Sequence, residues 1–363
     1  MMKIKSLTIA LLASLAMAAG FNSCSDDEET GSVANNYTIY QSAVDNKVIA
    51  NKKHDKAILL VAFGSTWQNS FKAFDKTVEA YKKQFKDCDV YMSFSSAICI
   101  NRAAAGEHAN DKGEDKAEIR NYYAPNFWLH AFGSARYKEI TVQSLQVIPG
   151  EEYSRVINYI KDFANNSLGD LNDQYLKTVT LKLGTPLLNN TDDVAKVAKT
   201  INKLCSSEAK KGIVAFMGHG NPDSYDTYKA NVRYTQLEEQ LQKINKNYFV
   251  GTVDMPDNYK QDVYARMKEA GFEKGNVVLY PLMSIAGDHA HNDMAGEGDE
   301  YWDAEDEESE DNSWNEYFSH KGYKVNSHMI GLLEQEEIRN LWIEHTKNPV
   351  ELEDYYHSMY PED

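Results

Sequence analysis

Cysteine and proline are scarce in this chain of 363 residues, with four and eight copies respectively, and each shortage excludes a class of protein. Eight prolines and twenty glycines are too few for a collagen-like chain or one that is disordered throughout. Cys88, Cys99 and Cys205 lie far apart and form neither a disulfide framework nor a zinc motif. We expect these three to be buried or partly buried free thiols.

An excess of basic charge is also missing, and the mean hydropathy of −0.58 excludes a polytopic membrane protein. The 38 basic and 55 acidic residues give a formal net charge of −17. Fourteen of the acids lie in two runs without Lys or Arg, 26–29 and 297–311, and outside these runs 41 acids face 38 bases. The body of the protein is therefore nearly neutral, which argues against nucleic acid as a partner.

The first 24 residues predict a targeting segment. Lys3 and Lys5 precede an apolar run over 7–19, which is too short to cross a bilayer comfortably. Cys24 and an acidic stretch follow, as in a bacterial lipoprotein signal whose cysteine is lipidated; a simple cleaved signal peptide is the alternative. We expect a signal peptide over 1–24, a solvated tether over 25–55, and a lipid anchor in the outer membrane, on its periplasmic or surface side, as the protein's contact with the membrane.

From residue 56 the sequence alternates apolar strand-like runs with amphipathic stretches. Strands that alternate with helices predict parallel sheets covered on both faces. We therefore predict an α/β protein with a parallel four-stranded sheet flanked by helices in each of two lobes, 56–190 and 191–347, followed by a tail over 348–363. A helix within 331–347 is expected to pack across a lobe. The predicted strands are 57–63, 89–94, 139–145, 178–183, 212–217, 248–253, 276–282 and 323–328.

Candidate metal ligands follow three consecutive strands of the second predicted lobe: His219, Asp254 and His289. Ligands of open parallel sheets bind beyond the carboxyl ends of the strands. Two imidazoles and a carboxylate suit a divalent first-row metal. Each residue also has a purely structural alternative: His219 could belong to a tight turn, Asp254 could cap the next helix, and His289 could lie in a hydrogen-bonded loop. Their shared sheet edge favours the metal site.

The segments around these residues resemble the anaerobic cobaltochelatases (the CbiK type, sirohydrochlorin cobaltochelatase). The resemblance runs from about residue 56 to 347 and is carried by 60–65, 142–153, 214–220, 251–254 and 281–295. It implies a two-lobed chelatase-like fold that binds a tetrapyrrole between its lobes and inserts Co²⁺ into sirohydrochlorin without ATP. The two histidines and the glutamate that hold the metal in this family correspond to His219, His289 and Asp254.

The resemblance also implies roles and departures. A neutral imidazole can be both ligand and proton acceptor, so His219 is the candidate catalytic residue, while His289 and Asp254 hold the metal. Asp254 is one methylene shorter than the family's glutamate. Gln146 stands where the family commonly has a histidine. His291 is an additional histidine, either a ligand or haem contact or a solvated loop residue.

Substrate contacts are expected from the first lobe at Gly64, Ser65 and Thr66, whose turn amides suit the carboxylates of a tetrapyrrole. Two further segments, 103–127 and 296–311, interrupt the alternation and are expected at the surface.

Two functions from different classes fit these features. The first is a metal chelatase, a lyase acting with Co²⁺, alternatively Fe²⁺, on a sirohydrochlorin-like tetrapyrrole. The second is an envelope lipoprotein that binds haem for uptake or iron removal, which the leader favours. We rank the chelatase first on its motifs, because a simple transporter would not need three metal ligands. A metal-dependent hydrolase lacks an activating base beyond His219. Expected partners are a tetrapyrrole, a divalent metal and a second copy of the chain as a possible oligomer.

Overall fold

The computed structural model describes residues 33–107, 118–297, 303, 306, 309 and 312–361. The leader and the predicted lipidation site Cys24 lie outside these residues. Among the helices of the described part, none is long and apolar enough to cross a membrane. Cys88 is half-buried, and Cys99 and Cys205 are buried, all three as free thiols, which confirms that prediction.

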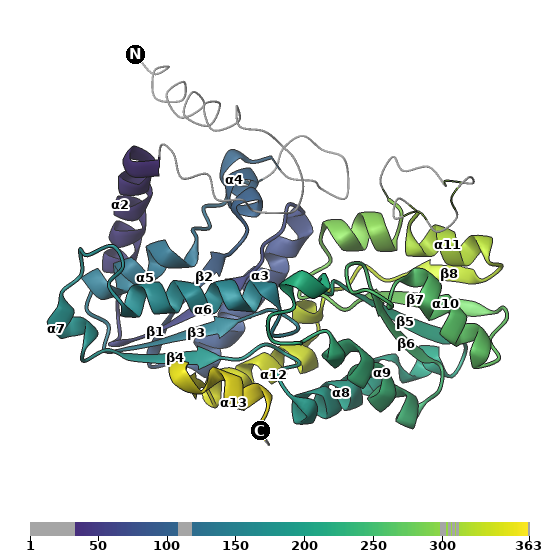
Figure 1. Ribbon diagram of the computed structural model, residues 1–363. Helices are drawn as coiled ribbons and strands as arrows, with labels where there is room; N and C mark the ends of the chain where they lie inside the picture. Colours follow the sequence, from purple (N-terminus) through teal and green to yellow (C-terminus); the bar gives the residue numbers. More distant parts are fainter. Residues whose placement is uncertain are drawn as a thin grey trace, which may run out of the picture.

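Two sheets form the centres of two lobes that lie side by side (Figure 1). The strand orders are β2-β1-β3-β4-β9 and β6-β5-β7-β8, and neighbouring strands are parallel except for β9, which runs antiparallel to β4. The predicted fold class is thus confirmed, with an additional edge strand in the first sheet. The first sheet contains β1 (Lys56–Ala62), β2 (Cys88–Phe94), β3 (Glu139–Ser144), β4 (Thr180–Gly184) and β9 (Val350–Glu351). The second contains β5 (Ile213–Gly218), β6 (Tyr248–Thr252), β7 (Asn276–Pro281) and β8 (Lys324–Ser327).

Alternate residues of the central strands face different cores, as the two-residue period of a strand requires. In β1, Ile58 and Leu60 join a core that both lobes share, whereas Leu59 faces a core on the outer side of the first sheet. In β5, Val214 joins the same shared core, and Met217 faces a third core on the outer side of the second sheet. A continuous apolar core therefore connects the lobes.

Helices cover both faces of each sheet. Residues of α2, α5 and α6 cover the outer face of the first sheet, those of α3, α8, α9 and α12 line the shared core, and those of α10 and α11 cover the outer face of the second sheet. The helices are α2 (Val33–Asn51), α3 (Gln68–Gln84), α4 (Ala97–Ala105), α5 (Pro125–Ser134), α6 (Glu151–Ala164), α7 (Asp173–Leu176), α8 (Thr191–Ala209), α9 (Val232–Ile244), α10 (Lys260–Glu269), α11 (Trp314–His320), α12 (Glu336–Lys347) and α13 (Tyr355–Met359).

Much of the segment expected to be a tether is the helix α2, which stands against α5 (Figure 1). Val44 and Val48 lie four residues apart on one helical face, and both are fully buried. Gln41 Nε2 donates a hydrogen bond to the carbonyl oxygen of Phe127 at 3.0 Å. The prediction of a solvated tether is therefore wrong over 41–48, because buried side chains fix this part of α2 to the first lobe.

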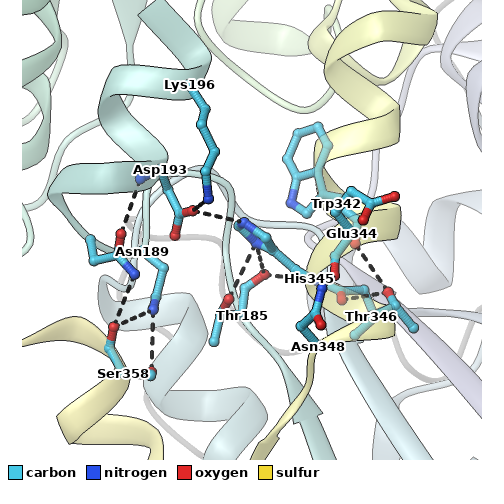
Figure 2. Close-up of polar contacts among 12 residues, drawn as sticks. Thr185, Asn189, Asp193, Lys196, Trp342, Glu344, His345, Thr346, Asn348 and Ser358 are labelled. Atoms are coloured by element: carbon cyan, nitrogen blue, oxygen red, sulfur yellow. Dashed lines mark hydrogen bonds and ion pairs between the residues drawn. The ribbon is translucent and has the colours of Figure 1, made fainter. Parts of the chain in front are cut away.

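The C-terminal segment, yellow in Figure 1, returns from the second lobe to the first. Helix α12 packs on β3 and β4 as well as on α8, and β9 pairs with β4. The expected tail over 348–363 is therefore part of the first lobe up to the end of the described residues. Figure 2 shows how polar side chains hold this segment: His345 of α12 contacts Thr185 Oγ1 through Nδ1 at 3.2 Å and Asp193 Oδ1 of α8 through Nε2 at 3.3 Å.

Candidate metal and substrate site

The predicted metal ligands follow the central strands of the second sheet. Strand β5 lies between β6 and β7 in the second sheet. The strand that follows β5 in the sequence lies on one side of it, and the next strand lies on the other. Open α/β sheets bind ligands at the carboxyl ends of the strands where the strand order reverses in this way. His219 comes directly after β5, Asp254 follows β6, and the loop with His289 follows β7. Strand β1 has the equivalent position in the first sheet, and 64–66 follow it.

His219 and Asp254 are tied together through the backbone, because the amide of Asp254 donates to the carbonyl oxygen of His219 at 2.8 Å. The Nδ1 atom of His219 lies 3.4 Å from Asp254 Oδ2 and 2.8 Å from the carbonyl oxygen of Gly220. A carbonyl oxygen only accepts, so Nδ1 carries the proton and Nε2 keeps its lone pair. Gly220 has a φ of +82°, and a Cβ there would lie 2.7 Å from the amide nitrogen of Met255, so this turn requires glycine.

The His289 ring meets the His219 ring edge to face, with centroids 4.7 Å apart. Its Nδ1 lies 2.5 Å from Asp293 Oδ2, on the π-helical turn η3 (Ala290–Met294). Nδ1 therefore donates to this carboxylate, and Nε2 is left with its lone pair. Metal-binding histidines usually donate their second N–H to a carboxylate or a backbone carbonyl, and both histidines do so here. The sequence analysis missed Asp293, although its position four residues after His289 was a signal.

The two histidines differ in their electrostatic surroundings. Burial, and then the neighbouring His289, lower the pKa of His219. Burial also lowers the pKa of His289, but the hydrogen bond and charge of Asp293 outweigh it, so this pKa ends above its usual value. His219 therefore stays uncharged to a lower pH than His289 does, which keeps it available as a ligand or a base.

The three candidate ligands lie near one another without forming a finished coordination sphere. The side chains of His219, Asp254 and His289 are 49%, 42% and 40% exposed. Within the described ranges, no three His, Cys, Asp or Glu side chains are already arranged as a metal-binding group. A cation shared by these residues would thus draw them closer together than they stand in the free protein.

The residues expected to contact substrate have partners within the protein. Gly64, Ser65 and Thr66 are all buried. Ser65 Oγ donates to Ser70 Oγ at 3.0 Å, and Thr66 Oγ1 lies 3.0 Å from both carboxylate oxygens of Asp288. Their role in substrate binding stays a prediction, and the contact of Thr66 reaches across to the second lobe.

The two remaining residues of interest are also enclosed. The carbonyl oxygen of Gln146 accepts a hydrogen bond from Trp342 Nε1 of α12 at 3.3 Å, so this residue anchors the C-terminal helix. His291 is only 5% exposed, its ring stacks on Trp67, and its Nδ1 lies 2.6 Å from Glu297 Oε2. The alternative of a solvated loop residue is therefore wrong for His291.

Exposed apolar side chains, which the sequence analysis did not single out, lie at the carboxyl ends of the first sheet. Phe63 follows β1 and is 49% exposed, and Ile98 at the start of α4 is 50% exposed. The amide of Ser96 donates to the carbonyl oxygen of Phe63 at 3.0 Å, which holds these two segments together. They offer apolar surface on the first-lobe side of the candidate site.

A separate pocket of about 240 Å³ lies at the opposite, amino-terminal ends of the first-sheet strands, where Lys56, Cys88 and Glu139 line it. The charged groups there are paired, as in the 2.9 Å contact between Lys56 Nζ and Asp87 Oδ2. Burial raises the pKa of the Cys88 thiol to about 12, which keeps it protonated and unreactive. The side chains of this pocket are therefore engaged with one another or unreactive.

Comparison with known proteins gives a family and a fold. The cobalt chelatase (CbiK) family matches residues 56–351. The chain is 24% identical to the sirohydrochlorin cobaltochelatase of Salmonella typhimurium, covering 80% of this chain and 94% of that protein. It is 26% identical to sirohydrochlorin cobaltochelatase CbiKC of Nitratidesulfovibrio vulgaris, covering 80% and 89%. SirB from Bacillus subtilis with Fe³⁺ has a similar fold, with a TM-score of 0.51 at 14% identity over 81% of this chain and 94% of SirB.

The match extends over both lobes and reaches the edge strand β9. It includes each of the three strand ends from which the candidate ligands come. The chain therefore belongs to the cobalt chelatase (CbiK) family, and it is a metal chelatase, as its motifs predicted.

Proposed function

We propose that this enzyme inserts Co²⁺ into sirohydrochlorin at a site formed by His219, Asp254 and His289. The observation that carries the proposal is the hydrogen bond that both histidines make through Nδ1. Each ring donates Nδ1–H to an oxygen within the protein, so Nε2 is the nitrogen that each ring has available for a cation. The Asp254 carboxylate lies close to the pair, with Oδ2 3.4 Å from His219 Nδ1. The names of the two curated relatives supply the substrate.

Insertion requires two pyrrole N–H protons to leave the macrocycle while a partly desolvated cation arrives. The lowered pKa of His219 keeps its Nε2 unprotonated at neutral pH. It can therefore bind the cation and, once the cation has passed to the macrocycle, accept one of the two protons, while the other passes to solvent. His289 is oriented by Asp293 and acts as a ligand. Asp254 supplies a negative charge that offsets part of the charge of the cation.

On the first-lobe side, Phe63 and Ile98 provide apolar surface for one face of a flat macrocycle. The backbone of 64–66 is the predicted partner for its carboxylates. Because Ser65 and Thr66 use their hydroxyls internally, we assign this role to main-chain atoms.

The test is the absorbance change of sirohydrochlorin on mixing with Co²⁺ and purified protein. We expect insertion by the wild type, and its loss in His219→Ala and His289→Ala. His357→Ala, an exposed histidine of α13, is the matched control and should keep activity. Absence of insertion with Co²⁺ and with Fe²⁺ would overturn the proposal.

The predicted leader supports a second candidate, an envelope protein that binds haem for uptake or iron removal. His291 is stacked and hydrogen-bonded, so His219 and His289 are the candidate ligands for haem iron at this site. A tight shift of the haem Soret band that His219→Ala and His289→Ala abolish, without insertion of any metal, is the outcome that this function requires.

We also propose that the enzyme is lipid-anchored through Cys24 in the cell envelope. The basic leader, the short apolar run and the cysteine support this address. Metabolic labelling with a fatty-acid analogue should mark the wild type but not Cys24→Ala. Equal labelling of both, or of neither, would contradict a lipid anchor at this residue.

A further inference from the structure

The loop that carries His289 is held by a single turn of the other lobe. Asp288, the residue before His289, accepts hydrogen bonds from two first-lobe side chains. Thr66 Oγ1 lies 3.0 Å from both of its oxygens, and Trp67 Nε1 lies 2.5 Å from Oδ1. These contacts join residues more than 220 positions apart in the sequence.

The residue two positions after His289 is held by the same turn. The His291 ring lies flat on the Trp67 indole, with centroids 3.4 Å apart and planes 4° apart. Glu297 holds the same ring at its edge, where Oε2 lies 2.6 Å from Nδ1. The His291 ring therefore cannot rotate without losing its contacts with both Trp67 and Glu297. The stack is enclosed, because His291 is almost completely buried.

A third contact fixes the start of the loop. Ser70 Oγ of α3 donates to the carbonyl oxygen of Ala286 at 3.2 Å. The first lobe thus holds the second-lobe segment 286–291 at three points, on both sides of His289. By contrast, the contacts of the His289 ring are with Asp293 and His219, both in its own lobe.

From these contacts we propose that Thr66 and Trp67 are positioning residues for the metal site. Through Asp288 and His291 they fix the backbone from which the His289 ring projects, so the first lobe sets the distance between the His289 and His219 rings. The inference rests on the proposed role of His289 as a metal ligand. It gives Thr66 a function distinct from substrate contact, because its hydrogen bond to Asp288 helps to hold the loop that carries His289 against the first lobe.

The two roles of Thr66 predict different defects. A substrate contact affects the KM for sirohydrochlorin and leaves Co²⁺ binding by the protein alone unchanged. A positioning residue affects Co²⁺ binding before any tetrapyrrole is present. Loss of the outer partner of a metal ligand typically weakens metal binding about 10–100-fold.

The experiment measures Co²⁺ affinity of the full chain without tetrapyrrole, by calorimetry and by the visible absorption of bound Co²⁺, which reports ligand geometry. We expect Thr66→Val and Trp67→Ala to bind Co²⁺ about 10-fold more weakly, with an altered spectrum. This is the lower end of the range for direct partners of a metal ligand, because these residues act through the neighbours of His289. Thr66→Ser keeps the hydroxyl and should restore wild-type affinity. Trp67→Phe keeps a ring on His291 but loses the N–H donor, and should give an intermediate affinity.

Thr200→Val on the surface of α8 is the matched control for Thr66→Val, since Thr200 Oγ1 bonds only within its own helix, to the carbonyl oxygen of Lys196. Thermal unfolding of each variant separates a local effect from a loss of fold, and Thr66→Val is nearly isosteric. Suppose that His289→Ala loses Co²⁺ binding while Thr66→Val and Trp67→Phe both keep wild-type affinity. This result would overturn the positioning role of Thr66 and Trp67 and leave His289 as a metal ligand. Wild-type affinity in His289→Ala would overturn the ligand assignment and this inference with it.

Discussion

The His219 and His289 rings stand almost perpendicular to each other, at 81°, with centroids 4.7 Å apart. In this arrangement the edge of one imidazole faces the plane of the other. Each ring has a hydrogen-bond partner at Nδ1, so neither can change its tautomer without losing that partner. The two rings are therefore held in place as a pair. We expect substitution of either ring to disable the site as much as substitution of both.

This unit leads to a prediction about combined substitutions. His219→Ala and His289→Ala should each lower the rate of cobalt insertion by more than about 100-fold, since loss of a ligand exceeds the loss of an outer partner. The double variant should be little slower than either single variant, because groups that act together are not additive. Single-turnover absorbance measurements test this. Multiplying effects would show that the two rings act independently.

The hydrogen bond between His289 and Asp293 predicts the pH dependence of Co²⁺ binding. Protons and Co²⁺ compete for Nε2, and Asp293 raises the pKa of His289. Co²⁺ affinity should therefore fall as the pH drops through that raised pKa. Asp293→Asn removes the charge, so the midpoint should move to lower pH, while affinity at high pH falls about 10–100-fold.

Calorimetric titrations from about one pH unit below to about two pH units above the unperturbed histidine pKa of about 6.5 give both quantities. Asp223→Asn, at an exposed aspartate in the 3₁₀ turn after β5, is the control and should leave the midpoint in place. An unchanged midpoint in Asp293→Asn would show that Asp293 does not control the protonation of His289.

Gly220 offers a test of the turn that carries His219. Gly220→Ala places a Cβ 2.7 Å from the amide nitrogen of Met255 at a positive φ, so we expect it to cost about 1–3 kcal/mol in the free energy of unfolding and to impair insertion. Gly271→Ala has nearly the same φ, +86°, but no atom within 4 Å. Gly271→Ala should lower the free energy of unfolding only by the backbone strain, and it should keep activity. Denaturant unfolding and insertion assays on both variants separate the clash from the strain.

The contact between Asp193 and His345 predicts acid sensitivity of the joint between the lobes (Figure 2). Burial raises the pKa of Asp193, but the hydrogen bond and charge of His345, followed by Lys196, outweigh it and leave the pKa below its usual value. The contribution of this carboxylate to stability is therefore present above the unfolded-state pKa of about 3.9 and disappears as the pH falls through the lower, folded-state pKa.

Asp193→Asn should thus cost about 2 kcal/mol in the free energy of unfolding at pH 7, as expected for a hydrogen bond to a charged group, and progressively less in acid. Its exposed neighbour provides the control, Asp192→Asn, which should change stability little. Urea unfolding at pH 7 and near pH 3 measures both variants. An equal loss at the two pH values would contradict a role for the Asp193 charge.

The sequence predicted the parallel sheets and the meeting of His219, Asp254 and His289, because both follow from local patterns. Alternating strands and helices determine the sheet type, and carboxyl ends of parallel strands share one edge. The same reasoning could have found Asp293 from its spacing after His289. Val44 and Val48 likewise carried the spacing of a helix face, which the acidic run before them obscured.

The contacts between the lobes could not be derived in this way. Thr66 and Asp288 are separated by 222 positions, and no periodicity links them. Their partnership depends on how two sheets are placed relative to each other, which local sequence does not specify. For the same reason, Thr66 resembles a ligand-binding residue in sequence, while the structure engages its hydroxyl with Asp288 of the other lobe.

The edge strand β9 consists of residues 350–351, yet it completes a sheet that begins at Lys56. During synthesis on the ribosome, the N-terminal lobe therefore has to wait for the last residues of the chain before its sheet and the cover supplied by α12 are in place. Neither lobe corresponds to a contiguous stretch that could be expressed alone with its full set of contacts. Circular permutation that joins the C-terminal segment to the start of α2 would make the first lobe contiguous in the sequence.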